Sequence, residues 1–271
     1  MKKHLPTLCM VLVFVVGLSL LLYPTISDYW NSFHQTQVIS GYGDSVARLD
    51  EISYDYVWQA ARQYNADLLQ EDNRFFPTED MHERYLSLLN VAGNGVMGFI
   101  EIPELSVRLP IYHSTDEAVL QVAVGHIEGS SLPVGGAGTH CLLSGHRGLP
   151  SAKLFSSLDQ MAVGDVFMLH VLDETLTYEV DQILVVEPGD VSALELDPLA
   201  DLCTLVTCTP YGINSHRLLV RGHRIETQKE KAPVTVTADA VQVERWKVAL
   251  AVAGPLLILV MMIGLLSRRR G

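Results

Sequence analysis

Two long apolar segments enclose the polar part of this 271-residue chain. Residues 5–27 and 248–267 contain no Asp, Glu, Lys or Arg. As a helix, each segment is long enough to cross the roughly 30 Å hydrocarbon core of a bilayer. We therefore predict two transmembrane helices. A cleaved signal peptide is the alternative for the first segment, but no Ala-x-Ala site follows it.

Basic residues at the two ends predict the orientation of these helices. Two lysines lie within residues 1–4, and three arginines lie within residues 268–271. The positive-inside rule places both tails in the cytoplasm, which an even number of spans permits. The chain is thus predicted to be a two-pass protein of the cell membrane with an extracellular middle.

After the first span, residues 28–92 are predicted to form an extracellular helical region. Between residues 44 and 70 apolar positions recur with a helical period, and Asp44 or Ser45 is the predicted N-cap. A second, short helix is predicted over residues 79–90, followed by a Gly-Asn-Gly turn.

From residue 96 the pattern changes to short β-type runs bounded by Gly, Pro and Asp. The predicted strands cover residues 96–102, 107–112, 139–143, 165–171, 176–186, 203–208 and 218–224. Helical inserts are predicted at residues 116–125 and 151–158. Many short strands without a βαβ rhythm indicate a mainly β fold, a closed mixed barrel over residues 93–226. A polar tether, residues 227–247, then leads to the second span.

The predicted extracellular part is acidic. The formal net charge of the chain is −12, and all 31 Asp and Glu residues lie between the two apolar segments. Such a surface argues against nucleic acid as a partner and against adhesion to anionic lipid. The bilayer is therefore a partner only through the two spans.

A candidate nucleophile lies at the end of the predicted strand 203–208. Cys208 is followed by Thr-Pro-Tyr-Gly, in which the proline donates no sheet hydrogen bond and the glycine permits positive φ. This turn is predicted to bring the sulfur to the rim of the barrel. Cys203 faces the opposite side because side chains alternate along a strand. Arg217 opens the next strand, and the reversal of the chain returns its guanidinium to the side of Cys208.

His146 lies between Gly145 and Gly148, which give the chain room to turn at the end of a predicted strand. The attack of a thiolate on a carbonyl needs a nearby histidine and a group that holds the developing oxyanion. Cys208, His146 and Arg217 supply these three parts.

Other residues near these three have competing interpretations. Thr207 and Tyr211, next to the nucleophile, are predicted substrate contacts. A metal site formed by His140, Cys141 and His146 is an alternative, but it lacks the usual ligand spacing. We predict no metal and no cofactor.

The cysteine count leaves a free thiol in the predicted extracellular part. Cys9 lies in the first span, so three cysteines lie outside, and an odd number leaves at least one unpaired. If a pair forms, we predict Cys141 with Cys203, because oxidation of Cys208 would remove the nucleophile.

Three motifs carry a resemblance to a known family. They are Thr204-Leu205-Val206-Thr207-Cys208, the run 208–224, and the segment 142–150 around His146. The first resembles the signature of the sortases, membrane-anchored cysteine transpeptidases of Gram-positive bacteria. The other two resemble the class C branch, which polymerises pili. The likeness extends from about residue 91 to residue 225 and includes both membrane segments.

The resemblance implies an eight-stranded sortase-type barrel. It implies that Cys208 attacks the Thr carbonyl of an LPXTG-like sorting signal and cleaves between Thr and Gly through a thioester. Arg217 steadies the oxyanion or the peptide, and His146 protonates the departing amine. The implied partners are pilin subunits that carry this signal and an acceptor lysine.

Three other functions remain open at this point. A wall-anchoring sortase would use an amine of a peptidoglycan precursor, although its usual single anchor fits poorly with two spans. A plain cysteine protease would use water, and the sequence does not distinguish it from a transpeptidase. A non-enzymatic binding barrel would not need the Cys-His-Arg set.

The family resemblance also implies a lid over the active site, often with an Asp-Pro-aromatic motif. Here the matching residues 70–77 contain Asp72, Phe75 and Phe76 but no Asp-Pro pair. We predict that this segment crosses the Cys208 groove with one phenylalanine near the sulfur. The alternative is that both aromatic rings pack against the barrel wall beside the preceding helix.

Overall fold

A computed structural model describes residues 5–71 and 73–227. Helix α1, Leu5–Val46, contains the predicted first span and continues well beyond it. Within the described residues, α1 is the one helix that is long and apolar enough to cross a membrane. The predicted second span, the cytoplasmic tails and the tether beyond Thr227 lie outside the described residues. The following description concerns the compact unit Leu20–Thr227.

The N-terminal helices differ from the prediction at their ends. The predicted N-cap of the helix over residues 44–70, Asp44 or Ser45, is wrong, because both residues still belong to α1. Helix α2, Glu51–Leu68, begins instead after Asp50, whose carboxylate accepts a hydrogen bond from Ser53 N at 2.7 Å. Helix α3, Glu79–Ser87, ends three residues earlier than predicted.

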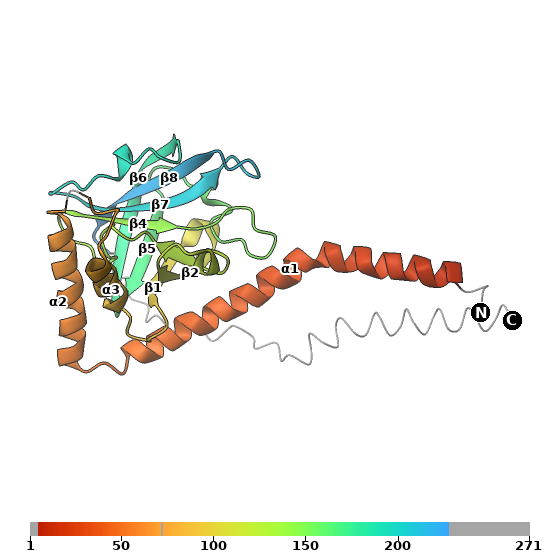
Figure 1. Ribbon diagram of the computed structural model, residues 1–271, viewed down its shortest axis with the longest axis horizontal. Helices are drawn as coiled ribbons and strands as arrows, with labels where there is room; N and C mark the ends of the chain where they lie inside the picture. Colours follow the sequence, from red (N-terminus) through yellow and green to blue (C-terminus); the bar gives the residue numbers. More distant parts are fainter. Residues whose placement is uncertain (1–4, 72, 228–271) are drawn as a thin grey trace. The chain divides into compact units, whose positions relative to one another are not determined.

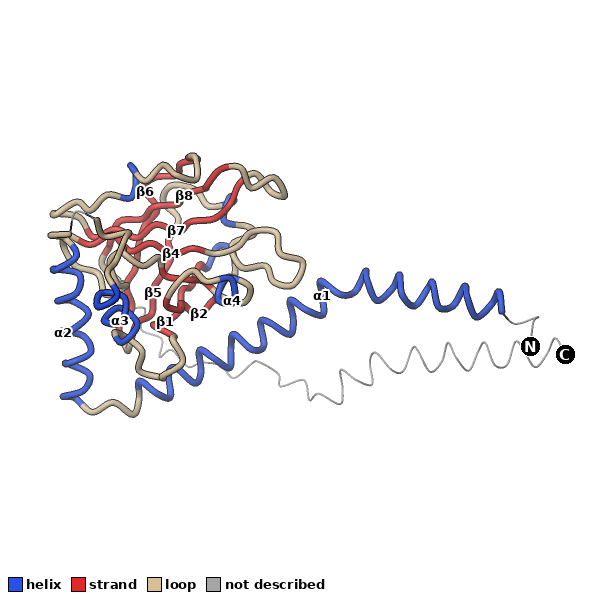
Figure 2. Tube along the Cα trace, in the orientation of Figure 1, coloured by secondary structure: helices blue, strands red, loops and turns tan. Residues whose placement is uncertain are grey.

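The predicted closed eight-stranded barrel is confirmed, with the strand order β1-β2-β3-β4-β7-β8-β6-β5. Its strands are β1 Val96–Ile102, β2 Val107–His113, β3 Val124–His126, β4 Thr139–Ser144, β5 Val166–Val171, β6 Glu174–Val186, β7 Asp201–Thr209 and β8 His216–Ile225. The pairs β2/β3 and β4/β7 are parallel. Pairing between β1 and β5 closes the barrel, whose strands are red in Figure 2.

Both predicted helical inserts are wrong in part. In place of a helix over residues 116–125, the chain forms the short α4, Glu117–Leu120, and then β3. A Cβ atom at Gly125 would lie 2.3 Å from Ser114 O, so close strand packing needs glycine there. In place of a helix over residues 151–158, the chain forms turns that lead to the 3₁₀-helix η3, Leu158–Gln160.

The core fills the barrel and extends under α2 and α3. Alternate residues of the strands point inward, including Leu205 and Cys203 of β7, and Trp58 and Leu68 of α2 belong to the same buried cluster. Helices α2 and α3 contact each other through Tyr64 and Tyr85 and lie beside the barrel (Figure 1). The inward position of Cys203 confirms the prediction that it faces away from Cys208.

The C-terminal part of α1 is attached to the barrel by polar contacts. The buried Tyr42 hydroxyl donates to Met97 O and accepts from Leu172 N, both at 2.8 Å. Three turns earlier in the helix, Asn31 donates to Ser151 O at 2.8 Å. This part of α1 therefore lies along the barrel and reaches the loop that follows His146.

Candidate active site

The β7/β8 pairing places Arg217 directly opposite Cys208. Directly opposed residues of antiparallel strands project from the same face, with Cβ atoms roughly 4.5–5.5 Å apart. The Arg217 guanidinium donates from Nη1 to Asn214 O at 3.3 Å and to His216 O at 3.2 Å. In the part of the chain that the structure describes, these two carbonyl groups are the partners of the Arg217 guanidinium, and no carboxylate contacts it.

His146 lies at the same end of the barrel because β4 runs parallel to β7. The ladder pairs Ser144 with Val206, and Gly145 N donates to Val206 O at 3.1 Å. Continued at the same register, His146 reaches the level of Cys208. The structure therefore brings the predicted cysteine, histidine and arginine together at one end of β4, β7 and β8.

Three cysteines lie in the compact unit Leu20–Thr227, and they differ in accessibility. Cys208 is a partly exposed free thiol, whereas Cys141 and Cys203 are buried free thiols that face each other across β4 and β7. Burial raises the pKa of the Cys203 thiol well above its usual value, which keeps it protonated. Because a nucleophile must reach its substrate, the partly exposed Cys208 is the one cysteine of this unit placed to act as a nucleophile, whereas Cys141 and Cys203 are enclosed in the core.

The alternative metal site at His140, Cys141 and His146 is not supported by the geometry. His140 and Cys141 are neighbours in β4 and project to opposite faces. Burial lowers the pKa of His140 to about 4, and its ring nitrogens already contact Glu195 O and Thr204 Oγ1.

The two predicted substrate contacts occupy different environments. The Thr207 side chain is buried, and its hydroxyl donates to Gly145 O at 2.7 Å. Tyr211 is 64% exposed, and its ring covers Gly148 so closely that a Cβ atom there would lie 2.8 Å from it. Tyr211 is thus accessible to a ligand, whereas Thr207 contacts the loop of His146.

The predicted lid segment packs on the outside of the barrel. Phe75 joins an apolar cluster, here called the outer cluster, which comprises the buried residues Leu142, Leu194, Val206 and Leu219 and their partly buried neighbours. Val206 lies two residues before Cys208, so both project from the same face of β7. Phe76 is 83% exposed, and Asp72 lies outside the described residues.

Arg74 fixes this segment to the barrel. Its guanidinium donates to Gly129 O at 3.0 Å and to Leu194 O at 2.6 Å, and it lies 4.3 Å from the centre of the Phe75 ring. Sequence reasoning missed this contact, because it depends on carbonyl groups that are distant in sequence.

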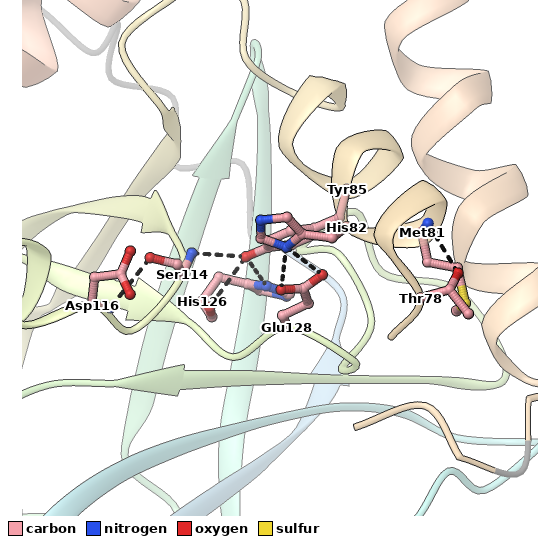
Figure 3. A network of polar contacts seen from close by, with 8 residues as sticks. All are labelled: Thr78, Met81, His82, Tyr85, Ser114, Asp116, His126 and Glu128. Carbon is pink, nitrogen blue, oxygen red and sulfur yellow. Dashed lines mark hydrogen bonds and ion pairs between the residues drawn. The ribbon is translucent and has the colours of Figure 1, made fainter. Parts of the chain in front are cut away.

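A buried polar network, also missed from the sequence, joins α3 to the barrel (Figure 3). The Tyr85 hydroxyl contacts His126 Nδ1 at 3.1 Å and accepts from Ser114 N at 3.0 Å. Beside it, His82 Nδ1 lies 2.8 Å from Glu128 Oε2. The network holds α3 against the chain on both sides of α4. Glu117 of α4 lies 4.0 Å from His146 Nε2.

A closed barrel with a free cysteine, a histidine and an arginine at one end is suited to acyl transfer by a cysteine nucleophile. The model of the sortase domain family matches residues 100–225. Sortase C1 from Streptococcus agalactiae is 48% identical, with a TM-score of 0.69, and the match covers 70% of this chain and 98% of that chain. The chain belongs to the sortase family.

Other relatives agree with this assignment. Sortase C from Streptococcus pneumoniae is 42% identical, with a TM-score of 0.61, and the match covers 73% of this chain and all of that chain. Sortase A from Bacillus anthracis is 25% identical over 85% of this chain and 99% of its own length. The matches to these two sortases C, at 48% and 42% identity over nearly the whole of each, confirm the class C resemblance.

Proposed function

We propose that this chain is a class C sortase that polymerises pilin subunits at the cell membrane. The observation that carries the catalytic part of this proposal is the register of β7 and β8, which sets Arg217 opposite Cys208 at the strand end that His146 also reaches. The crystal structure of Streptococcus pneumoniae sortase C provides insight into pilin substrate specificity, and the similarity of this chain to it supports pilin as the substrate class.

In the proposed reaction, the Cys208 thiolate attacks the Thr carbonyl of an LPXTG-like signal. Arg217 stabilises the oxyanion or the bound peptide, and His146 donates a proton to the departing Gly amine. The lysine amine of a second pilin then attacks the thioester, and His146 accepts its proton. The exposed Tyr211 contacts the peptide, whereas the buried Thr207 holds the loop of His146.

The proposed location follows from α1 and the apolar segment 248–267. Two spans with both tails in the cytoplasm would hold the barrel outside the cell, where sorting signals emerge. No metal or organic cofactor is needed for the proposed steps, because the nucleophile, the acid and the oxyanion donor are all side chains.

The proposed function is tested by incubating the full-length protein in detergent with a candidate pilin. We expect a ladder of pilin oligomers whose mass-spectrometric fragments contain a Thr–Lys isopeptide bond. Transfer to a peptidoglycan precursor instead of lysine would favour the wall-anchoring alternative. Release of a free Thr carboxylate as the sole product would favour a protease.

We further propose that residues 70–77 form a lid, with Phe75 as the residue that closes it. Phe75 covers the outer cluster on the face of β7 that carries Cys208, and Arg74 is bonded to Leu194 O beneath it. An apolar surface next to the nucleophile is suited to the Leu and Pro of a sorting signal. Phe75 and the substrate would therefore compete for one surface.

Phe75→Ser is expected to increase the rate at which a bulky thiol reagent modifies Cys208 by about tenfold. Loss of roughly 1–2 kcal/mol of apolar burial shifts the lid equilibrium by about that factor. Phe76→Ser is the matched control, because the Phe76 ring is exposed and its substitution removes little buried apolar surface. An unchanged modification rate together with a large fall in melting temperature would favour wall packing.

A further inference from the structure

Both neighbours of His146 contact neighbours of Cys208. Thr207 Oγ1 donates to Gly145 O at 2.7 Å, and Arg147 Nη1 donates to Thr209 Oγ1 at 3.4 Å. Thr207 and Thr209 project from the face of β7 opposite to Cys208. These contacts hold the backbone around His146 from the face of β7 that is opposite to the Cys208 sulfur. They therefore leave the space on the sulfur side free.

Arg147 is the charged member of this arrangement. Its side chain is 9% exposed, and Nη2 pairs with Asp159 Oδ2 of η3 at 2.5 Å. Its guanidinium lies 6.0 Å from the centre of the Tyr211 ring, which also covers Gly148. Arg147 therefore joins the beginning of the loop after His146, the end of that loop and the chain that follows Cys208.

The burial of Arg147 lowers the stability of the folded state, which is unexpected for a residue with a purely structural role. Its Nε atom is buried and has no hydrogen-bond partner among the described residues, and an unsatisfied buried donor destabilises the folded state. An apolar side chain of similar length would fill the same space without this cost. A planar guanidinium, however, directs separate N–H groups at two acceptors in fixed directions, which neither an apolar chain nor a lysine does.

We propose that Arg147 is a positioning residue that sets His146 against Cys208. It does not touch the substrate; it acts by fixing the backbone from which the imidazole projects. Displacement of a catalytic group by about 1 Å can lower a rate by about a hundredfold, so this restraint affects the reaction directly. The inference rests on the proposed cysteine and histidine chemistry and is independent of which amine accepts the acyl group.

The test is the rate of Cys208 alkylation by iodoacetamide at pH 7 in the full-length protein in detergent. A histidine beside a thiol increases the fraction of that thiol present as thiolate. The His146→Ala variant therefore gives the alkylation rate of Cys208 without the effect of the imidazole. We expect Arg147→Met to lower the alkylation rate by about tenfold, toward the His146→Ala value, and Arg147→Lys to restore part of it. Thioester formation with a sorting-signal peptide should fall in kcat, with little change in KM.

Arg221→Met is the matched control, because Arg221 of β8 forms a comparable pair with Asp181 of β6 at 2.9 Å. It should lower the melting temperature without slowing alkylation. If Cys208 is alkylated in Arg147→Met at the wild-type rate, the proposal is overturned, whatever the melting temperature of the variant. If Arg147→Met does not fold, Asp159→Asn and Thr209→Val replace it, and wild-type rates in both would also overturn it. The alkylation assay uses no peptide, so it tests the role of Arg147 independently of the substrate. If the wild-type protein does not cleave sorting-signal peptides, that result contradicts only the proposed function.

Discussion

Cys208→Ala is expected to abolish thioester formation with an LPXTG-like peptide. The attack requires a thiolate at the surface, and the other two cysteines of the unit Leu20–Thr227 are buried in the core. The substitution itself should be well tolerated, because Cys208 is only partly buried at a strand end. The measurement is the mass of the intact protein after incubation with peptide, where an acyl-enzyme appears as an added mass on the wild type alone.

Cys141→Ala and Cys203→Ala are the matched controls for this prediction. Each removes a buried sulfur and leaves a small cavity, so we expect a lower melting temperature and an unchanged acylation per folded molecule. An acyl-enzyme that persists in Cys208→Ala, or that disappears in Cys203→Ala while the protein remains folded, would contradict the assignment of the nucleophile.

The sequence was sufficient for the barrel and for the grouping of Cys208, Arg217 and His146. Seven of the eight strands are long enough to show β-type runs, and a single short turn separates β7 from β8. The side of the strand on which Cys208 lies follows from alternation alone. Arg217 could be placed beside it because an antiparallel return fixes the register over so short a loop.

Features that depend on tertiary contacts were not predictable in this way. Strand β3 has three residues, too few for any periodicity, and Gly125 is selected by the approach of Ser114 O. Helix α1 continues through Asp44 because its last part is attached to the barrel through Tyr42. The contacts of Arg147 and Arg74 join segments that lie far apart in the sequence, so no local pattern marks them.

His146→Ala and Arg217→Ala are each expected to lower kcat/KM for peptide cleavage by at least about a hundredfold. This is the usual effect of losing a general acid or an oxyanion donor. The structure supports separate roles, because Arg217 is bonded to carbonyl groups of its own loop and lies opposite the sulfur, whereas His146 projects from the end of β4. The measurement is the steady-state rate with a fluorogenic sorting-signal peptide.

The two variants should differ in their response to the leaving group. A peptide ester or activated amide needs less protonation of its leaving group than the natural Gly amide does, so it should restore much of the rate in His146→Ala. It should restore little in Arg217→Ala, because the oxyanion still forms and still lacks its donor. Arg217→Lys keeps the charge but loses the planar fork, and we expect it to recover only part of the rate. Equal rescue of His146→Ala and Arg217→Ala by the activated substrate would contradict this division of roles, and full activity in either alanine variant would remove that residue from the mechanism.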